Sequence, residues 1–389
     1  QRGSVEVAVA APLDELGTMD DARRAWQLVA SEINDAGGIN GRTLRVHERD
    51  TPLTDPNDTA PIADGFVDLS EQGYRYIISL VSGAALEPVM RAATTYDVLA
   101  LSITSEDSAT ALPSTDGLLL RGVLPTDRVI DKQATALQAA GLINILSIGP
   151  TRSGVPDARL SAMSAAYAGC TACSATELTY PAEADLYSYD WQSFGARAMT
   201  RPALAQPPQV VYLAIADAQV LLDVVRSLDV AGYTGLYYFA YAGYLPWVIP
   251  AFKPSLYQRF RSYDLALPPS PELDQFSALY SERYGDSFVP EPRLLAFTDY
   301  LALLALAMDQ VGDTDPGLVA AKVKQIASPP GTAYGPLEYR AAQSALRAGQ
   351  DINYQGLSGA LDFDANGEVS DGFIQEYGVN TDGDVVALP

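Results

Sequence analysis

The chain has 389 residues, of which 48% are hydrophobic and 19% are charged, and its formal net charge is −23. This balance excludes a disordered or fibrous chain, and the length favours two domains over a single core. An acidic surface repels phosphate backbones and anionic membranes, so we expect no nucleic-acid partner. No uninterrupted apolar run approaches the ~20 residues that cross a bilayer, and we expect no membrane span.

Strands and helices are predicted to alternate along the chain. Short apolar runs rich in β-branched residues predict strands at Val5–Ala10, Tyr76–Val81, Val98–Ile103, Ile143–Ile148, Gln209–Ile215 and Gly235–Tyr241. Helical periodicity lies between several of them, at Ala85–Thr95, Arg128–Ala140 and Ala218–Ala231. Apolar strands that alternate with helices are typical of parallel sheets covered on both faces. The predicted class is therefore α/β, with doubly wound parallel sheets.

The stretch Ser31–Thr51 reads SEINDAGGINGRTLRVHERDT and follows a helix-patterned run. Gly37 and Gly38 are predicted to end that helix, because glycine accepts the left-handed conformation that helix ends often need. Asn40-Gly41 predicts a tight turn, and the alternation of Leu44–Glu48 predicts a half-buried strand. From the residues alone, this stretch indicates a helix, a stop, a turn and a strand.

Signatures of catalysis and cofactor binding are missing from the sequence. The segment Ala11–Gly17, which follows the first strand, lacks the glycine spacing of a dinucleotide-binding loop. The sequence contains no G-x-S-x-G nucleophile elbow, and the single histidine, His47, lies in a predicted strand. We therefore expect no enzyme and no cofactor.

The two cysteines, Cys170 and Cys173, are separated by two residues. A redox pair of this spacing normally opens a helix after a strand, and a zinc site would need two further ligands, although His47 is far away in sequence. We predict a local structural disulfide in preference to free thiols, and no metal site. A disulfide fits an exported protein.

Several segments along the chain together carry the resemblance to one known family. The SEINDAGGINGRTL stretch is similar to a family phrase that reads approximately E-I-N-x-A-G-G-I-N-G-R-x-[IL]. Further similarity lies in VEVAVAAPL (5–13), YIISLVSG (76–83), LRGVLPTD (120–127), AFTDYLA (296–302) and GLSGALDFDANGEVSDGFIQEYGV (356–379). Over nearly its whole length, the chain therefore resembles the leucine/isoleucine/valine-binding family of type I periplasmic solute-binding proteins.

The resemblance implies two doubly wound lobes joined by a three-crossover hinge, with a ligand cleft between them. The N-terminal lobe is expected to comprise 1–121 and 268–363, and the C-terminal lobe 122–267 and 364–389. Because the third crossover comes late in the family, the C-terminal strands should return to the second lobe.

Two candidate ligand sites follow strands of the first lobe. Ser82 and Gly83 follow the strand Tyr76–Val81, where a helix start offers free N–H groups to a carboxylate, although Ser82 as a plain N-cap is an equal reading of the position. Beyond the next strand, the resemblance implies that a hydroxyl loop holds the ligand's carboxylate and amino groups. That loop is Ser102-Ile103-Thr104-Ser105 here, and Thr104 and Ser105 are the leading candidates.

The third candidate site belongs to the second lobe. Asp217 precedes the helix Ala218–Ala231, and Tyr241 ends the strand Gly235–Tyr241. By resemblance, a tyrosine and an acidic residue at these strand ends close over the α-ammonium of an amino acid. The acidic position falls at Tyr241 or Ala242, and neither is acidic. Either Asp217 substitutes for it, or the ligand is not a plain α-amino acid; Asp217 is also readable as a simple helix N-cap.

The resemblance implies a monomeric extracytoplasmic receptor that closes on a small molecule and delivers it to an ABC permease. The expected ligand is an amino acid, branched-chain or related, with an aromatic or short-chain carboxylate as the alternative. A ligand-sensing ectodomain of a signalling receptor is the competing function. A periplasmic or extracellular location is expected, with a lipid anchor in the precursor left open; the start at Gln1 instead of Met fits a processed chain.

Overall fold

The structure is a computed structural model that describes residues 3–13, 17–53, 58–81, 83–103, 117–152, 154–182, 188–200, 207–240, 243, 245–288 and 290–388. The chain divides into two compact units: unit 1 comprises 1–125 and 266–373, and unit 2 comprises 126–265 and 374–389. The chain thus passes between the units after residues 125, 265 and 373. The lobe boundaries expected from the sequence were after residues 121, 267 and 363.

Unit 1 is built on a parallel sheet with the strand order β2-β1-β3-β4-β5. Its strands are β1 (Ser4–Ala11), β2 (Thr43–Asp50), β3 (Tyr76–Ser79), β4 (Leu99–Ser102) and β5 (Leu119–Arg121). Strands β3, β4 and β5 are buried along their whole length, which explains why they read as continuous apolar runs. The predicted doubly wound parallel class is confirmed for this unit.

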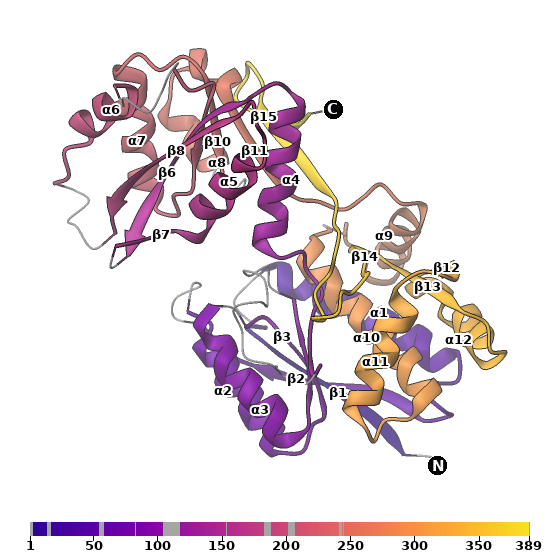
Figure 1. Ribbon diagram of the computed structural model, residues 1–389. Coiled ribbons are helices and arrows are strands. Elements are labelled where there is room, and N and C mark those ends of the chain that lie inside the picture. The colour runs from indigo at the N-terminus through magenta and orange to yellow at the C-terminus, as the bar shows by residue number, and fades with distance from the viewer. Residues whose placement is uncertain are drawn as a thin grey trace. The chain divides into compact units, whose positions relative to one another are not determined.

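Helices cover both faces of this sheet (Figure 1). On one face, buried side chains of α2 and α3 pack against Ala8, Ile77 and Ala100. On the other face, α1 packs against α10, with the rings of Trp26 and Phe297 5.2 Å apart. The helical elements are α1 (Gly17–Asp35), α2 (Ala60–Glu71), η1 (Gly83–Ala85), α3 (Leu86–Tyr96), α9 (Pro271–Tyr284), α10 (Pro292–Val311), α11 (Pro316–Ala327), η6 (Pro336–Glu338) and α12 (Tyr339–Arg347). A small sheet adds β12 (Thr332–Tyr334), β13 (Ile352–Gly356) and β14 (Gly359–Ala360).

Helix α10 is the one described helix that is long and apolar enough to cross a membrane by length and composition. In its most apolar window, 83% is buried inside the structure. A helix that is apolar on all sides is expected at the centre of a large core, because every face then meets other side chains. We therefore describe α10 as the central core helix of unit 1.

The AGGINGR turn joins α1 to β2 and docks on α10. Gly38 has a φ of +67°, and a Cβ there would overlap with the carbonyl oxygen of Arg42, so only glycine fits. Asn40 donates its backbone N–H to Asp309 (2.9 Å) and its side-chain amide to the carbonyl of Met308 (3.2 Å). Arg42 forms a bidentate ion pair with Asp313 (2.6 and 3.0 Å). The predicted helix stop and turn are confirmed. The turn is also bonded to the C-terminal end of α10, through the two hydrogen bonds of Asn40.

A buried ion pair lies beside the first and third passages of the chain between the units. Arg121, the last residue of β5, bonds to Glu368, and both side chains are almost fully buried. Their backbones are also paired, since Arg121 donates to Gly367 (2.8 Å) and accepts from Val369 (3.2 Å). The segment around Glu368 therefore extends the edge of the sheet beyond β5.

Unit 2 has a second sheet, in the order β8-β6-β9-β10-β11-β15-β16, with β7 paired to the end of β6. Its strands are β6 (Asn144–Arg152), β7 (Val155–Pro156), β8 (Ser174–Pro181), β9 (Val210–Leu213), β10 (Leu236–Phe239), β11 (Phe260–Leu265), β15 (Ile374–Val379) and β16 (Val385–Ala387). The strands from β8 to β11 are parallel, whereas β15 and β16 are antiparallel additions from the C-terminal segment.

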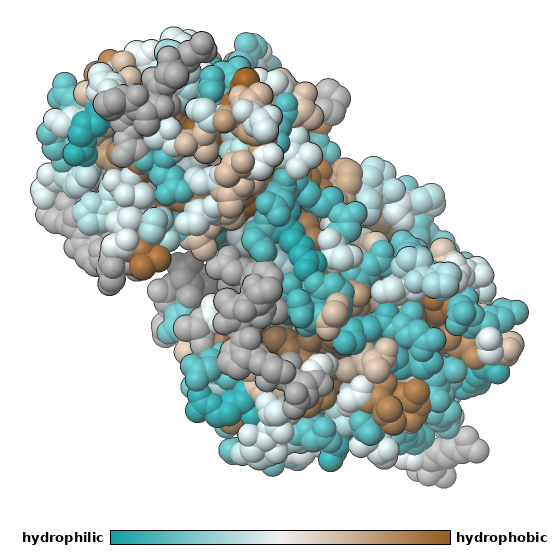
Figure 2. All heavy atoms as spheres, viewed as in Figure 1, coloured by the Kyte–Doolittle hydropathy of each residue, from teal (hydrophilic) through white to brown (hydrophobic). Residues whose placement is uncertain are grey.

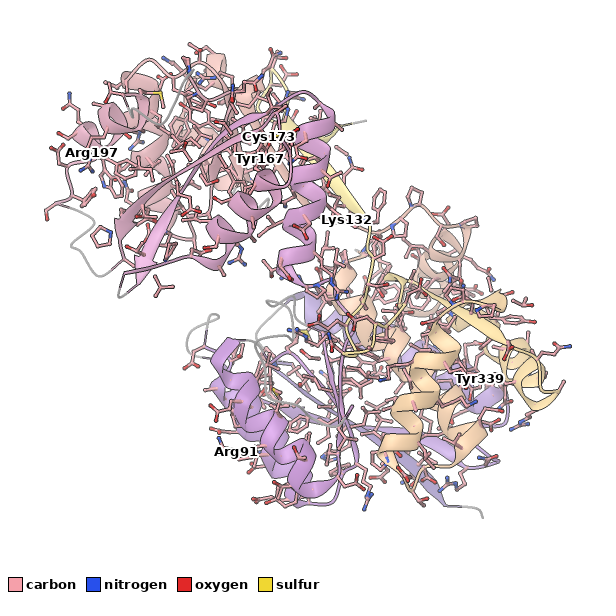
Figure 3. All side chains as sticks on the ribbon, viewed as in Figure 1. Arg91, Lys132, Tyr167, Cys173, Arg197 and Tyr339 are labelled. Atoms are coloured by element: carbon pink, nitrogen blue, oxygen red, sulfur yellow. A yellow bond between two sulfur atoms is a disulfide. The ribbon has the colours of Figure 1, made fainter. Side chains whose placement is uncertain are left out.

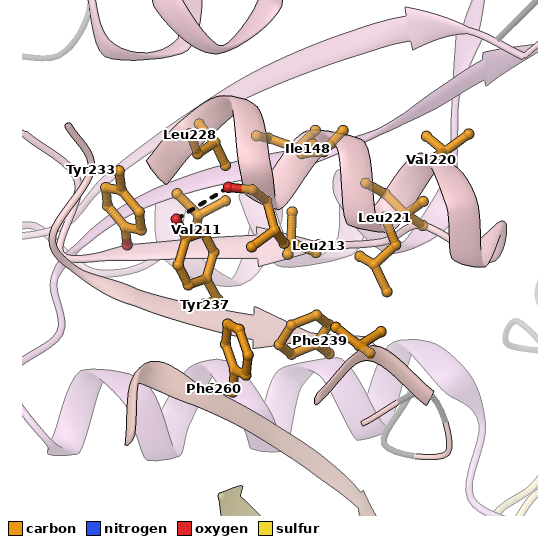
Figure 4. Packing of buried hydrophobic residues seen from close by; sticks show 14 of the residues in the cluster. Ile148, Val211, Leu213, Val220, Leu221, Leu228, Tyr233, Tyr237, Phe239 and Phe260 are labelled. Atoms are coloured by element: carbon orange, nitrogen blue, oxygen red, sulfur yellow. Dashed lines mark hydrogen bonds between the residues drawn. The ribbon is translucent and has the colours of Figure 1, made fainter. Parts of the chain in front are cut away.

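The second sheet is also covered on both faces. One core joins α6, α7 and α8 to Val211, Leu213 and Phe239 (Figure 4), and the other joins α4 and α5 to the opposite face. The helical elements are α4 (Thr126–Ala139), α5 (Ala158–Ala168), α6 (Trp191–Met199), α7 (Ala218–Val230), α8 (Leu245–Val248), η4 (Ile249–Ala251) and η5 (Pro254–Arg259). The predicted doubly wound class therefore holds for both units.

Cys170 and Cys173 form the predicted disulfide, in the turn between α5 and β8. Cys173 packs against the buried cluster that contains Tyr167, and Figure 3 labels both residues near the end of α5. The Tyr167 hydroxyl donates to the carbonyl of Leu142 (2.8 Å), which ties the same helix end to the strand side of the unit. The bridge thus closes a short turn that the core already holds.

Candidate functional site

The first sheet reverses its winding between β1 and β3. From β1 the chain moves to β2 on one side, and it later places β3 on the other side. The connections leaving the carboxyl ends of β1 and β3 therefore diverge, and such a switch point is where open α/β sheets bind ligands. The connection after β1 is held at its root, because the N–H of Leu13 donates to Asp50 (2.8 Å).

Ser102 and Gly83 lie at this carboxyl edge of unit 1. Ser102 is 1% exposed, and its hydroxyl donates to the carbonyl of Val81 (3.4 Å), so it joins the end of β4 to the segment after β3. Gly83 is exposed and has a φ of +57°, a conformation that favours glycine. A short 3₁₀ turn, η1, begins at Gly83, and the α-helix begins only at Leu86. The prediction placed the helix at Ala85, one residue earlier.

Four predicted site residues lie outside the described residues. They are Ser82, Thr104, Ser105 and Tyr241. The elements that lead to them are described: β3 leads to Ser82, β4 leads to Thr104 and Ser105, and β10 leads to Tyr241. Each of these strands ends at the carboxyl edge of its own sheet, as the sequence predicted.

Asp217 lies at the switch point of the second sheet. There, β6 has β8 on one side and β9 on the other, and Asp217 follows β9. Its carboxylate accepts the N–H of Val220 (2.9 Å), so it is the N-cap of α7. Asp217 is exposed, and its bond to Val220 uses one of the two carboxylate oxygens. The N-cap reading of Asp217 is thus confirmed, and a second contact of this residue stays a prediction.

The cap at Asp217 gives a measurable expectation. Replacing Asp217 by alanine should lower the free energy of unfolding by about 1 kcal/mol, because the first turn of α7 loses its side-chain acceptor. Asp217→Asn should change it by only a few tenths of that amount, since asparagine caps helices equally well. Chemical denaturation of the three proteins measures both values. An equal loss in the two variants would show that the carboxylate charge matters more than the cap.

Two surface hollows in unit 1 contain none of the predicted site residues. One, of about 610 Å³, lies beside α1, β2 and the end of α9. The other, of about 630 Å³, is lined by Ser4, Tyr74 and Arg75 at the amino end of the sheet. Ligands of open α/β sheets bind at the carboxyl ends of the strands, so we assign the site to neither hollow.

Sequence reasoning missed the polar clusters that the fold assembles from distant segments. Arg121 and Glu368 both occur in segments that carried the family resemblance, yet nothing in their spacing pairs them. Asp309 collects bonds from Asn40, Gln343 and Arg347, which are widely separated in sequence. The available signal was the presence of Asp299 and Asp309 in the otherwise apolar helix α10. Carboxylates that are buried in this way need several hydrogen-bond donors, which distant segments must supply.

Two doubly wound parallel sheets, in units that the chain connects three times, define the type I periplasmic binding fold. The profile of the periplasmic binding protein family matches residues 5–353, and the chain belongs to this family. Members of this family are solute-binding receptors of the periplasm or the cell exterior. No curated protein matches the chain.

Solved structures with the same fold are distant in sequence. A substrate-binding protein of an ABC transporter from Desulfitobacterium hafniense, in complex with Leu, has 18% identity and a TM-score of 0.68, covering 99% of this chain and 100% of that one. A putative branched-chain amino acid ABC transporter from Rhodospirillum rubrum has 16% identity and a TM-score of 0.66, with 99% and 100% covered. LivJ from Streptococcus pneumoniae, in complex with isoleucine, has 14% identity and a TM-score of 0.63, with 99% and 98% covered.

Proposed function

We propose that this protein is an extracytoplasmic solute receptor that binds an amino acid or a related carboxylate and delivers it to an ABC importer. The observation that carries the proposal is the family match over residues 5–353. The structural neighbours with bound Leu and isoleucine support the ligand class. The described candidates Gly83, Ser102 and Asp217 lie at the carboxyl ends of strands, where such folds bind ligands, and this supports the proposed sites.

The proposed mechanism is closure of the two units over the ligand. The ligand's carboxylate docks on unit 1, at the hydroxyl and N–H groups of Ser82, Gly83 and the 102–105 loop. Unit 2 then contributes Asp217 and Tyr241. Closure follows when the ligand binds the closed state more tightly than the open one. The receptor acts as a monomer in this proposal, and a lipid anchor in the precursor would keep it beside its permease.

The chemistry at Tyr241-Ala242 favours a second ligand class as the alternative. Neither residue is acidic, and Asp217 already caps α7. A buried ammonium without a carboxylate partner costs roughly 3–5 kcal/mol. An aromatic or short-chain carboxylate has no ammonium and avoids this cost. An amino acid therefore needs the Asp217 carboxylate as a partner for its ammonium, whereas a carboxylate ligand without an ammonium does not.

A thermal-shift panel of amino acids and carboxylates tests the proposal. A true ligand at a hundred times its Kd should stabilise the protein by about 2.7 kcal/mol, and its melting temperature should rise with concentration. Ser82→Ala and Tyr241→Ala should remove this shift and leave the melting temperature of the free protein unchanged. Ser31→Ala, at an exposed position of α1, is the matched control and should retain the full shift.

The variant Asp217→Asn distinguishes the two ligand classes. If the ligand is an amino acid, the variant should bind it at least tenfold more weakly while its unfolding free energy stays unchanged. A carboxylate ligand without an ammonium should bind both proteins equally. Absence of stabilisation by every member of the panel contradicts the proposed ligand class, and unchanged binding in Ser82→Ala and Tyr241→Ala contradicts the proposed site.

A further inference from the structure

A glutamate on the C-terminal strand β15 joins three strands of unit 2. Both carboxylate oxygens of Glu376 accept a tyrosine hydroxyl, one from Tyr238 on β10 and the other from Tyr263 on β11 (3.2 Å). Glu376 lies directly opposite Tyr263 in the antiparallel pairing of β11 with β15. The rings of Tyr238 and Tyr263 are stacked, with their centroids 5.5 Å apart. We call these three residues the tyrosine–glutamate cluster.

Helix α4 also contributes to this region, because it packs against β11 and β15. The side-chain amide of Gln133, which is 3% exposed, donates to the backbone carbonyl of Tyr263 (3.3 Å). Arg261 lies two positions before Tyr263 and therefore on the same face of β11, with its Nε 3.9 Å from a Glu376 oxygen. The Glu376 carboxylate thus has two hydroxyl donors and a nearby cation.

The two tyrosine hydroxyls remain donors throughout the physiological pH range. Tyr238 is 2% exposed, and burial together with the hydrogen bond to Glu376 raises its pKa far above the ordinary value. Burial also raises the pKa of Tyr263 to about 12. Hydrogen bonds to an ionised acceptor are stronger than those between neutral groups. Loss of the Glu376 carboxylate should therefore weaken the ties of β10 and β11 at once.

The tyrosine–glutamate cluster lies where the chain enters and leaves unit 2. The chain passes between the units after residues 125, 265 and 373. Helix α4 begins at Thr126, directly after the first passage; β11 ends at Leu265, directly before the second; and β15 begins at Ile374, directly after the third. The elements that carry all three connections into unit 2 therefore meet around one hydrogen-bonded cluster.

Strand β10 connects the same cluster to the candidate ligand site. Tyr238 lies near the carboxyl end of β10, and the chain continues from there to Tyr241. Ser262 adds a second tie between β10 and β11, because its fully buried hydroxyl donates to the carbonyl of Phe239 (2.7 Å). The strand that leads to a candidate ligand residue is thus bonded, through side chains as well as backbone, to the strand before the second passage.

We propose that Glu376 is a positioning residue, which ties the end of β10, and with it Tyr241, to the roots of the connections between the units. The part played by Tyr241 rests on the proposed function, whereas the tie among β10, β11 and β15 does not. Hinges are a few residues at the ends of elements that absorb the change in φ and ψ. Because the ends of α4, β11 and β15 are held together inside unit 2, bending is confined to the connections themselves.

Spin labels, one in each unit, test the effect on the hinge in the free protein. Ser31→Cys on α1 and Val230→Cys on α7 are exposed positions, and both native cysteines are bonded to each other, so only the introduced thiols take the label. Pulsed electron paramagnetic resonance then measures the distribution of distances between the two labels. Glu376→Gln leaves one carbonyl oxygen for two hydroxyls, and we expect it to widen this distribution because the roots of the connections can move separately.

Glu177→Gln is the matched control for Glu376→Gln. Glu177 is also half-buried and accepts the hydroxyl of Ser164, but it lies on β8, towards the other edge of the same sheet. Its distance distribution should equal that of the wild-type protein. A distribution in Glu376→Gln that is no wider than in the control overturns the proposal.

Hydrogen exchange tests the tie inside unit 2. Tyr238→Phe removes one hydroxyl from β10, and the amides of β11 and β15 should lose at least about tenfold protection, since a hydrogen bond to a charged group is worth that much in an equilibrium constant. The loss should exceed that in Tyr167→Phe, which removes a buried hydroxyl that donates to the neutral carbonyl of Leu142 elsewhere in unit 2. Equal losses in the two variants overturn the tie.

Both measurements are made without a ligand, so they separate this inference from the proposed function. A wrong ligand class leaves both results unaffected. If Glu376→Gln does not fold, Tyr263→Phe replaces it in the spin-label experiment, because it removes one donor from a side chain that is only half-buried. An unchanged distance distribution in Tyr263→Phe then overturns the proposal.

Discussion

Replacing Glu368 by glutamine is expected to lower the free energy of unfolding of unit 1 by about 3–5 kcal/mol. Arg121 and Glu368 are 2% and 1% exposed at their side chains, so the substitution removes a carboxylate that faces a buried guanidinium. A buried guanidinium that loses this carboxylate keeps its desolvation cost and loses the attraction that the carboxylate contributed. This is the largest effect that we expect from a single charge-neutralising substitution in the described structure.

An exposed pair on α3 provides the matched control for this prediction. Glu87 and Arg91 form an ion pair at 2.7 Å, with side chains that are 68% and 70% exposed. Glu87→Gln makes the same chemical change and should cost less than about 0.5 kcal/mol, because solvent screens the pair. Denaturant titrations of the two variants give the comparison. Similar losses in both would mean that burial does not set the strength of the Arg121–Glu368 pair.

Removing the carboxylate of Asp309 is expected to be the second large effect, with a loss of about 3 kcal/mol in Asp309→Ala. Asp309 accepts hydrogen bonds from the backbone N–H of Asn40 (2.9 Å) and from the side-chain amide of Gln343 (3.2 Å). It also accepts two from the Arg347 guanidinium, through Nη2 (2.6 Å) and Nε (2.8 Å). Arg347 is half exposed and can turn to water, and the Gln343 amide also donates to the carbonyl of Gly38 (3.0 Å). The variant therefore loses the hydrogen bonds that Asn40 and Gln343 donate to a buried, charged carboxylate. A hydrogen bond to a charged group contributes roughly 1.5–3 kcal/mol.

Asp68→Ala is the control for Asp309, since it also truncates an aspartate that pairs with an arginine. Asp68 and Arg49 lie 3.0 Å apart and are 52% and 47% exposed, so the change should stay within about 0.5 kcal/mol. Asp309→Asn keeps one carbonyl oxygen and should lie between the alanine variant and the wild-type protein. A loss in Asp309→Ala no greater than in Asp68→Ala would contradict the role of the AGGINGR turn as a docked element.

The acidity of the protein agrees with an exposed polar surface. Figure 2 shows hydrophilic residues over much of the visible face, with hydrophobic residues in small groups. The buried carboxylates of Asp299 and Asp309 form a separate population, held by hydrogen bonds or by Arg347. Net charge alone does not separate these two populations, because it counts a solvated carboxylate and a buried one equally.

The alternation of strands and helices was predictable from the sequence because both sheets are covered on their two faces. The strands predicted at Val98–Ile103 and Gly235–Tyr241 correspond to β4 (Leu99–Ser102) and β10 (Leu236–Phe239). Val98 and Ile103 are buried but lie outside β4, although the N–H of Ile103 still donates to the carbonyl of Ser79 (3.2 Å). An apolar run therefore extends beyond the strand that it marks. Hydrophobic periodicity therefore locates an element better than it locates its ends.

The candidate site was predictable only in outline. The positions of Ser102 at the end of a strand and of Asp217 after one followed from the alternation of elements, but their partners did not. Burial of Ser102 against Val81, and capping of α7 by Asp217, depend on how neighbouring chain segments meet. Side-chain hydroxyls and carboxylates have many possible partners, and local sequence does not choose among them.

The sequence by itself determined the helix stop, the turn and the strand of the AGGINGR stretch, because glycine and asparagine at these positions restrict the backbone locally. It also determined the family, since the phrase continues through several other segments. Only the tertiary structure decided that Asn40 docks on Asp309, that Arg121 faces Glu368, and that Tyr238 meets Glu376. These contacts join residues far apart in the chain, and their energies depend on burial, which no local pattern contains.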